Sequence, residues 1–285
     1  MHEERIQKFP VLRSAYGDLT KSERRIADYI TAVPECVLAQ TISDIAAATE
    51  SSEITVSRFC KKLGFNGLQE FKMNLTAELS TAENKTYHDI QGSDDCHAVS
   101  VKVFQNISDG LQDTLSLLDD NAVDKAAQIL QHARRIAVYG FGNSATVCRD
   151  IATRYLRLGF AIHDYADSHM QVTSAALLTS QDAVLAVSHS GASYELIQSV
   201  TTAKQNGAAI IVITSHGQSP LAKLADICLC GMGREVNYSS EAGASRMIHM
   251  AIGDVLYTRI AMANNREYQK NMKKMRQEIV KKRVK

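Results

Sequence analysis

The stretch that decides the fold is Ser188-His189-Ser190-Gly191-Ala192-Ser193-Tyr194-Glu195. An apolar run over 183–187 precedes it, and apolar residues at helical spacing follow it over 196–200. The pattern predicts a buried strand that ends in a hydroxyl-rich turn, from which a helix begins. Such a turn suits an anion, because the first N–H groups of a helix have no partner within it and the helix dipole favours negative charge there.

The turn allows a functional and a structural interpretation. Ser188, Ser190 and Ser193 supply neutral donors around one point, and Gly191 lets the backbone approach closely, which together suit a phosphate monoester. Alternatively, Ser190 or Ser193 only caps the helix and Gly191 only forms the turn. The stretch taken alone favours neither interpretation.

Strands and helices alternate from residue 135 onward. Near-continuous apolar runs predict five strands, at 136–139, 161–165, 183–187, 209–214 and 227–229. Buried strands that alternate with helices indicate a doubly wound parallel sheet in an α/β domain. Ligands of such sheets bind at the carboxyl ends of the strands, where the glycine- and serine-containing turns at 140–144 and 188–193 both lie.

The Gly140-x-Gly142 turn is a weak match to a dinucleotide-binding fingerprint. Position 145, where that fingerprint has its third glycine, is Ala, and the nearest acidic residues to the end of the second strand, Asp164 and Asp167, have no clear register with it. We therefore expect no nicotinamide cofactor, and no other cofactor.

The first eighty residues predict a helical domain. Thr20-Lys21-Ser22-Glu23 is a capping box. Apolar spacing then predicts three short helices, the second around residues 42–49 with a cap at Thr41 or Ser43, and the third ending at Gly64. Short helices separated by tight turns favour a helix-turn-helix.

The outward face of the third helix would meet DNA in that arrangement. Short polar side chains could reach base edges or phosphates, and the basic ones the backbone; the candidates are Ser52, Glu53, Thr55, Ser57, Arg58, Lys61 and Lys62. Glu50 stands where the tight turn usually has glycine, which predicts a positive φ at a non-glycine residue. The alternative is a small helical bundle whose charged face is simply solvated.

Composition sets wider bounds. A chain of 285 residues with 45% hydrophobic and 22% charged residues is typical of a soluble protein of about two domains, and the net charge of +1 gives no argument for nucleic acid. The six cysteines are scattered without a C-x-x-C pair, so we expect reduced thiols and no metal site. No apolar run approaches a membrane span and no signal-peptide pattern begins the chain, so we expect a cytoplasmic protein.

The domain boundaries follow from local composition. We predict a helix-turn-helix domain at 1–79, a polar linker at 80–98, the sheet domain at 99–265 and a basic carboxy-terminal helix at 266–285. The last helix has an apolar stripe of Tyr268, Met272, Met275 and Ile279, which favours packing on its own or a partner subunit over a supplementary DNA contact.

Two motifs together resemble a known family. The Ser-x-Ser-Gly-x-Ser-x-Glu element at 188–195, with Gly140-Phe-Gly142-Asn-Ser144 and Ile213-Thr214-Ser215, resembles the sugar isomerase (SIS) domain. The segments at 58–65 and 69–72 look like the helix-turn-helix of RpiR-family bacterial regulators. The resemblance covers nearly the whole chain, in the expected domain order. It implies a regulator that senses a phosphorylated sugar and binds operator DNA as a homodimer or homotetramer.

The resemblance also implies ligand-binding positions. Ser144, Ser188, Ser190 and Ser193 would hold the phosphate with the N–H of Gly191; the full candidate set is Gly142, Asn143, Ser144, Ser188, Ser190, Gly191, Ser193, Glu195, Glu241 and Arg246. Glu195 could orient the loop, meet a sugar hydroxyl or only complement the helix dipole. Arg246 could reach the ligand or bridge subunits.

SIS domains also occur in aldose–ketose isomerases, which need a base that moves a proton between adjacent carbons. The candidate bases are Glu195, Glu241, His189, His216 and His249. His189 lies between two serines, so we expect a structural histidine that points away from the phosphate, toward a neighbouring helix or interface. We expect a binding protein rather than an enzyme; the alternative is a phosphosugar isomerase with an appended helical domain.

Overall fold

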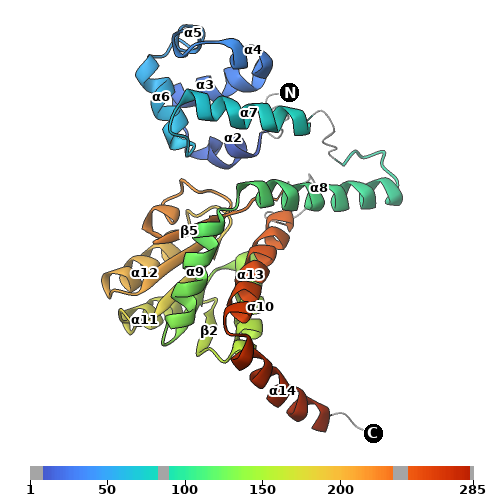
Figure 1. Ribbon diagram of the computed structural model, residues 1–285, viewed down its shortest axis with the longest axis vertical. Helices are drawn as coiled ribbons and strands as arrows, with labels where there is room; N and C mark the ends of the chain where they lie inside the picture. The colour runs from blue at the N-terminus through green and yellow to red at the C-terminus, as the bar shows by residue number, and fades with distance from the viewer. Residues whose placement is uncertain (1–8, 83–89, 234–242, 283–285) are drawn as a thin grey trace. The chain divides into compact units, whose positions relative to one another are not determined.

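The computed structural model describes residues 9–82, 90–233 and 243–282. The chain forms two compact units, Met1–Lys102 and Val103–Lys285, hereafter the amino-terminal and carboxy-terminal units. The boundary falls inside the long helix α8 (Cys96–Leu117) (Figure 1). None of the helices in the described ranges has both the length and the apolar character that a membrane crossing requires.

The amino-terminal unit is helical. Its elements before α8 are α2 (Pro10–Ala15), η1 (Tyr16–Asp18), α3 (Lys21–Ala32), α4 (Pro34–Ala39), α5 (Ile42–Ala48), α6 (Glu53–Lys62) and α7 (Leu68–Ala82). Each α-helix contributes a buried apolar side chain to one core, which includes Leu12, Ile26, Val37, Ile45, Val56 and Phe71. The Phe71 ring makes T-shaped contacts with both Phe59 and Phe65, with centroids 6.2 and 5.5 Å apart. Aromatic contacts of this kind add to the hydrophobic stabilisation.

Side-chain caps fix where three of these helices begin. Thr20 and Glu23 form the predicted capping box at the start of α3. Thr41, not Ser43, caps α5, in a second capping box with Asp44. Ser52 caps α6, because its hydroxyl accepts a hydrogen bond from Thr55 N–H at 3.1 Å.

The unit has more helices than the three predicted. The helices α2 and α4 are six residues long, and each begins with a proline at its first position, where the missing N–H does no harm. The helix α7 continues to Ala82, into the segment expected to be a linker. Pro34 therefore begins a helix as well as ending one, an outcome that apolar spacing alone does not predict.

The carboxy-terminal unit has the predicted α/β fold. Its strands are β1 (Ile136–Tyr139), β2 (Ile162–Tyr165), β3 (Ala183–Ser188), β4 (Ala209–Thr214) and β5 (Ile227–Cys230). All pairings are parallel and the order is β2-β1-β3-β4-β5. The helix α9 (Asp120–His132) precedes the first strand. The helices between the strands are α10 (Gly142–Tyr155), η2 (Leu156–Leu158), α11 (Ser168–Ala176), α12 (Tyr194–Gln205) and η3 (Ala222–Leu224), and the last strand is followed by α13 (Gly243–Ala263) and α14 (Asn265–Lys281).

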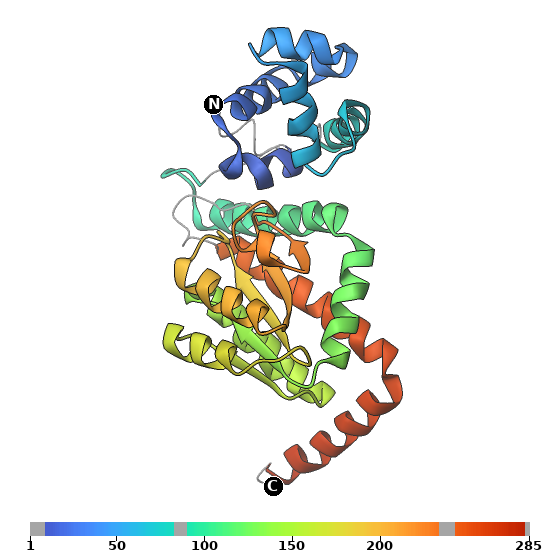
Figure 2. The same cartoon turned by 90° about the vertical axis from the view of Figure 1, so that its left-hand side faces the viewer.

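Helices cover both faces of the sheet (Figures 1 and 2). Alternate strand residues such as Val138 and Leu185 pack with α9, α10 and α13, whereas their neighbours Tyr139 and Val184 pack with α11 and α12. This alternation explains why β1, β3 and β4 are almost entirely apolar, since both of their faces are buried. The edge strand β2 is less buried and includes the polar residues His163 and Asp164. The sheet order reverses between β1 and β3, so the loops after these two strands diverge at the point where parallel sheets bind ligands.

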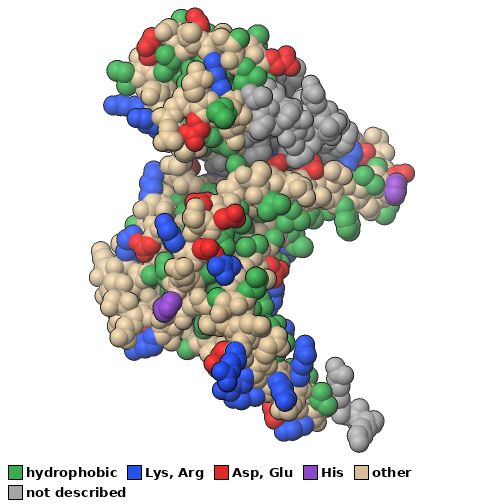
Figure 3. Space-filling model, viewed as in Figure 1, with side chains coloured by type: hydrophobic (Ala, Val, Ile, Leu, Met, Phe, Trp, Pro, Cys, Tyr) green, Lys and Arg blue, Asp and Glu red, His purple; other side chains and the backbone are tan. Residues whose placement is uncertain are grey.

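The segment predicted to be a basic carboxy-terminal helix, 266–285, overlaps the helix α14 (Asn265–Lys281). Lys and Arg side chains gather over α14 (Figure 3). Its apolar stripe begins at Tyr268, which packs on the core of the carboxy-terminal unit, and Asn271 Nδ2 donates to Leu158 O at 3.1 Å. Farther along, Ile279 is 57% exposed. The first half of α14 thus packs on its own subunit, whereas its end carries both apolar and basic side chains into solvent.

Candidate functional site

A cleft of about 220 Å³ lies at the switch point of the sheet, between the loops after β1 and β3. Five of the predicted ligand residues line it: Asn143, Ser144, Ser188, Ser190 and Ser193. Among the described lining residues none is Asp, Glu, Lys or Arg. The cleft therefore offers hydroxyl, amide and backbone groups to a ligand.

Hydrogen bonds within the loop after β3 set its shape. Ser188 Oγ accepts from Gly191 N–H at 3.0 Å, and Ser190 Oγ accepts from Ala192 N–H at 3.3 Å. Gly191 has a φ of +61°, and a Cβ at this position would lie 2.0 Å from Ser219 Oγ in the loop after β4. Both the left-handed backbone and the close approach require glycine.

Ser193 occupies the N-cap position of α12, but its side chain makes no capping hydrogen bond. A serine retained only to cap the helix would accept from an N–H of the first turn. Ser193 therefore makes no capping hydrogen bond in this structure, and Ser190 accepts one only from Ala192 within the loop. The first N–H groups of this 12-residue helix lie at the edge of the cleft without a side-chain cap.

The loop after β1 supplies the opposite wall. Gly140 is buried, and a Cβ there would lie 2.7 Å from Cys148 Sγ and 3.0 Å from Val187 O, so this glycine allows β1 and β3 to end close together. Gly142 follows with a φ of +51° and starts α10. The turn carries Asn143 and Ser144 to the cleft.

The remaining predicted ligand residues have other positions. Glu195 is exposed in the first turn of α12 and does not belong to the described lining of the cleft. Arg246, in the first turn of α13, is half-buried and is likewise absent from that lining. Glu241 lies outside the described residues.

Four lining residues were not among the predicted ligand positions: Phe141, Val187, His189 and Leu196. His189 was expected to point away from the cleft, yet it both lines the cleft and has a structural partner, because its Nδ1 lies 3.0 Å from Ser215 Oγ. The sequence contained an indication of all four, since each is adjacent in sequence to a predicted ligand residue or to the end of a strand. Which neighbours face the cleft depends on the path of the loops.

Ser215 connects His189 to a second histidine. Its buried hydroxyl lies 3.2 Å from His249 Nε2, which also lies 2.9 Å from Gly231 O. Burial is the main cause of a pKa lowered to about 4 at His249; the hydrogen bond to Gly231 opposes this shift, and charge repulsion from His189 and His216 adds to it. His249 is consequently neutral near pH 7 and holds the loops after β4 and β5 together.

The helix-turn-helix consists of α5, a four-residue turn and α6. Ser51 N–H donates to Ala46 O at 2.9 Å and Glu50 N–H donates to Ala47 O at 3.3 Å, the pair of bonds that defines a Schellman helix ending. Glu50 has the positive φ that the sequence predicts, +47°, and is the one non-glycine residue with positive φ in the described chain. Arg25 Nη2 donates to its carbonyl oxygen at 3.1 Å and supports the turn.

The predicted DNA-facing residues of α6 divide into two groups. Ser57 is half-buried, and Arg58 and Lys61 are exposed and have no hydrogen-bond or ion-pair partner within the described residues. The others are engaged within the unit. Lys62, predicted to face outward, instead donates to Glu23 Oε2 at 2.7 Å and to Asp18 O at 2.8 Å. Its position beside Leu63, at the edge of the buried face, turns it toward α3.

The residues at the start of α6 also have local partners. Ser52 Oγ and Thr55 Oγ1 lie 2.8 Å apart, and Glu53 Oε1 accepts from Ser43 Oγ at 2.6 Å. All three remain exposed or half-buried, so they can still meet a ligand at their outer edges. Their first role in the structure is to fix the start of α6 against α5.

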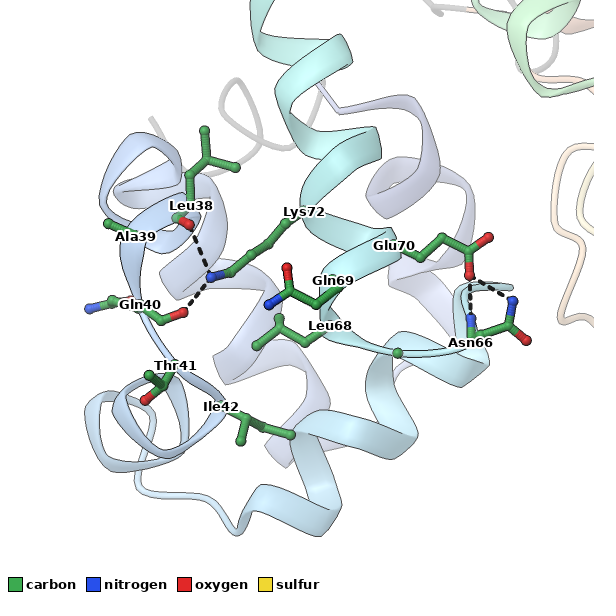
Figure 4. Close-up of a pocket in the computed structure, with 11 residues that line it drawn as sticks. Leu38, Ala39, Gln40, Thr41, Ile42, Asn66, Leu68, Gln69, Glu70 and Lys72 are labelled. Atoms are coloured by element: carbon green, nitrogen blue, oxygen red, sulfur yellow. Dashed lines mark hydrogen bonds between the residues drawn. The ribbon is translucent and has the colours of Figure 1, made fainter.

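A second hollow, of about 800 Å³, lies in the amino-terminal unit between the end of α4 and the start of α7 (Figure 4). Lys72 crosses it and donates to the carbonyl oxygens of Leu38 and Gln40. These bonds satisfy the end of α4 and tie α7 to the chain that enters α5. We assign this hollow to the architecture of the helix-turn-helix.

No group of three or more potential metal ligands occurs within the part of the chain that the structure describes. All six cysteines are free, and Cys60 and Cys148 are buried. Burial raises the pKa of the Cys60 thiol to about 11, so this side chain is an unreactive part of the core.

Comparison with known proteins identifies both units. The helix-turn-helix domain of the rpiR family matches residues 6–82, and the SIS domain matches residues 129–245. An uncharacterized HTH-type transcriptional regulator of Caldanaerobacter subterraneus subsp. tengcongensis is 34% identical over 251 residues, which span 88% of this chain and 89% of that protein. Another from Haemophilus influenzae is 33% identical over 248 residues, 86% of each chain.

Solved structures of other proteins are similar to this one. The Vibrio vulnificus NanR protein in complex with ManNAc-6P has a TM-score of 0.63 and 27% identity, over 97% of this chain and 100% of that one. The sugar isomerase domain of an RpiR transcription factor from Sphaerobacter thermophilus shares the fold, with a TM-score of 0.58 and 22% identity over 62% of this chain and 98% of that one. The chain therefore belongs to the family of HTH-type transcriptional regulators that combine an rpiR-family helix-turn-helix domain with a SIS domain.

Proposed function

We propose that this regulator senses a phosphorylated sugar in the cleft between β1 and β3, and that the bound sugar changes its affinity for operator DNA. The observation that carries the proposal is Ser193, an N-cap residue that leaves its own helix uncapped and lines the cleft. A phosphate at this point would accept hydrogen bonds from the first turn of α12 and from the surrounding hydroxyls. NanR, a relative that binds ManNAc-6P, supports a ligand of this class.

The electrostatics of the cleft support a small dianion held without a counter-ion. Neutral serine and asparagine donors and the positive end of the α12 dipole favour negative charge, typically by up to ~2 kcal/mol for the dipole in partly buried sites. The described lining of the cleft carries no formal positive charge, so these neutral donors and the helix dipole would provide the attraction. The cleft is also small enough that a single phosphosugar would fill much of it.

The same cleft favours sensing over isomerisation. Isomerisation requires a general base within hydrogen-bond reach of the substrate carbon-bound proton. The described lining holds no carboxylate, and the Nδ1 of its one histidine, His189, is engaged by Ser215. Release of phosphorylated aldose or ketose by the purified protein would contradict this part of the proposal.

Thermal denaturation of the full chain with a panel of phosphosugars tests the sensing half. A ligand at a hundred times its dissociation constant stabilises the folded state by ~2.7 kcal/mol. In a unit of this size, each kcal/mol raises the Tm by about 2–4 °C. The unphosphorylated sugars should have no effect, and a panel without any stabilising phosphosugar would refute the proposal.

Three variants test the division of roles. Ser193→Ala should abolish the ligand-induced Tm shift but leave basal stability and ligand-free DNA affinity unchanged, because the hydroxyl caps no helix. Ser116→Ala, an exposed serine on α8, is its control. Arg58→Ala should weaken DNA binding and preserve the ligand-induced shift. Loss of both activities in a folded Ser193→Ala or Arg58→Ala protein would contradict the proposed separation.

A further inference from the structure

The helix α6 has two opposed faces. Val56, Phe59 and Cys60 are buried in the core of the amino-terminal unit. The opposite face presents residues at positions i, i+3, i+4 and i+7, which lie in one row along a helix; they are Ile54, Ser57, Arg58 and Lys61. Since the buried face holds the helix against the unit, this row is the face that a DNA duplex would meet.

Ile54 is the unexpected member of the row. It is a large apolar side chain, 66% exposed, at the second position of the helix. The polar residues beside it already have hydrogen-bond partners, since Ser43 Oγ donates to Glu53 Oε1 and Ser52 Oγ bonds with Thr55 Oγ1. Ile54 thus projects from the amino-terminal end of α6 between side chains that are already engaged.

The chemistry of the row matches the major groove. Recognition helices contact base edges with their amino-terminal residues. Thymine presents a 5-methyl group there, which apolar side chains recognise, whereas cytosine, adenine and guanine have no such group. Arg58 and Lys61, one and two turns farther along the same face, carry positive charge that suits the phosphate backbone.

We propose that Ile54 is a specificity-determining residue that packs against the 5-methyl group of one thymine in each half-site of the operator. The inference rests on the proposed operator binding and adds a base preference to it. An apolar contact with one methyl group excludes water from both surfaces. It therefore discriminates thymine from uracil, which pairs identically and differs only in that methyl group.

The test begins with selection of a preferred duplex by the full chain from random DNA. Each thymine of the selected site is then replaced in turn by deoxyuridine, and the affinity is measured at fixed salt concentration. Wild-type protein should lose about fourfold in affinity at one position per half-site, the effect of burying a single methyl group. Ile54→Ala should bind the thymine and uracil duplexes equally.

Met73→Ala is the matched control, because Met73 is another largely exposed apolar residue of the same unit, 75% exposed on α7. It should keep the wild-type ratio of thymine to uracil affinity. If no position is sensitive to the methyl group, or if Ile54→Ala retains the sensitivity, the inference is overturned while operator binding stands. If the wild-type chain selects no sequence at all, operator recognition itself fails, and the inference fails with it.

Discussion

Replacing Gly191 by alanine should damage the loop after β3 far more than the same replacement at Gly142. Both glycines have left-handed φ values, +61° and +51°, where an L side chain adds about 1–2 kcal/mol. A Cβ at Gly142 would meet no atom within 4 Å, whereas one at Gly191 would lie 2.0 Å from Ser219 Oγ and 2.5 Å from Ser219 Cβ. Both substitutions therefore introduce the same kind of backbone strain, but only Gly191→Ala also causes a steric clash, with Ser219.

The collision sets the expected difference in stability. Gly142→Ala should cost about 1 kcal/mol, because the stiffer unfolded chain offsets part of the strain. Gly191→Ala should cost about 1–3 kcal/mol more, the usual penalty of overpacking. The collision would also displace the Ser188–Gly191 hydrogen bond, so phosphosugar binding should fall with stability.

Chemical denaturation of the full chain, followed by circular dichroism, measures both free energies of unfolding. The double variant with Ser219→Gly removes the opposing side chain and should recover part of the loss, with a coupling energy in the range of about 0.5–3 kcal/mol. The reasoning is refuted if Gly191→Ala is no more destabilising than Gly142→Ala. Additive effects of Gly191→Ala and Ser219→Gly would refute it equally.

Three further substitutions have defined outcomes. Glu50→Gly should leave the amino-terminal unit as stable or up to about 1 kcal/mol more stable in thermal denaturation, because glycine accepts its φ of +47° without strain. Burial raises the pKa of Asp182, but hydrogen bonds from Arg134 and Thr179 outweigh it and hold the pKa at about 2. Ionised Asp182 thus stabilises the fold above pH ~4, and this stabilisation is lost as the pH falls toward 2. Asp182→Asn should therefore lower the free energy of unfolding by about 2 kcal/mol at pH 7. It should also make that free energy depend less on pH between 4 and 2, as measured by acid denaturation. His249, with its pKa lowered to about 4, binds a proton more readily in the unfolded chain; stability should therefore fall as the pH drops from 6.5 to 4, and His249→Gln should reduce that slope in denaturation measured at stepped pH.

Much of the fold was predictable from local sequence features such as apolar runs, turn residues and helix caps. The central strands β1, β3 and β4 are almost entirely apolar because both of their faces are covered, and the predicted β4 coincides with the observed strand Ala209–Thr214. The positive φ at Glu50 follows from turn geometry alone. Capping at Thr20 required only two residues three positions apart.

Features that depend on long-range contacts were not predictable. The helices α2 and α4 are too short for a periodic signal, and tertiary packing stabilises them. Lys62 lies at the border between the buried and exposed faces of α6. Its side chain points toward Glu23, an ion-pair partner 39 positions away in sequence. Likewise, the serines of the cleft were identifiable from their turn, but the positions of His189 and Leu196 at its wall depend on how two loops meet.

The cleft joins parts of the chain that are distant in sequence. Its walls come from the loops after β1 and β3, which become neighbours only when the sheet has assembled. A small molecule bound to both loops would stabilise the pairing of β1 with β3. Its affinity would therefore depend on whether these two strands are correctly paired. For the phosphosugar sensor that we propose, damage far from the cleft, at any contact that aligns β1 with β3, would therefore weaken ligand binding before the protein unfolds.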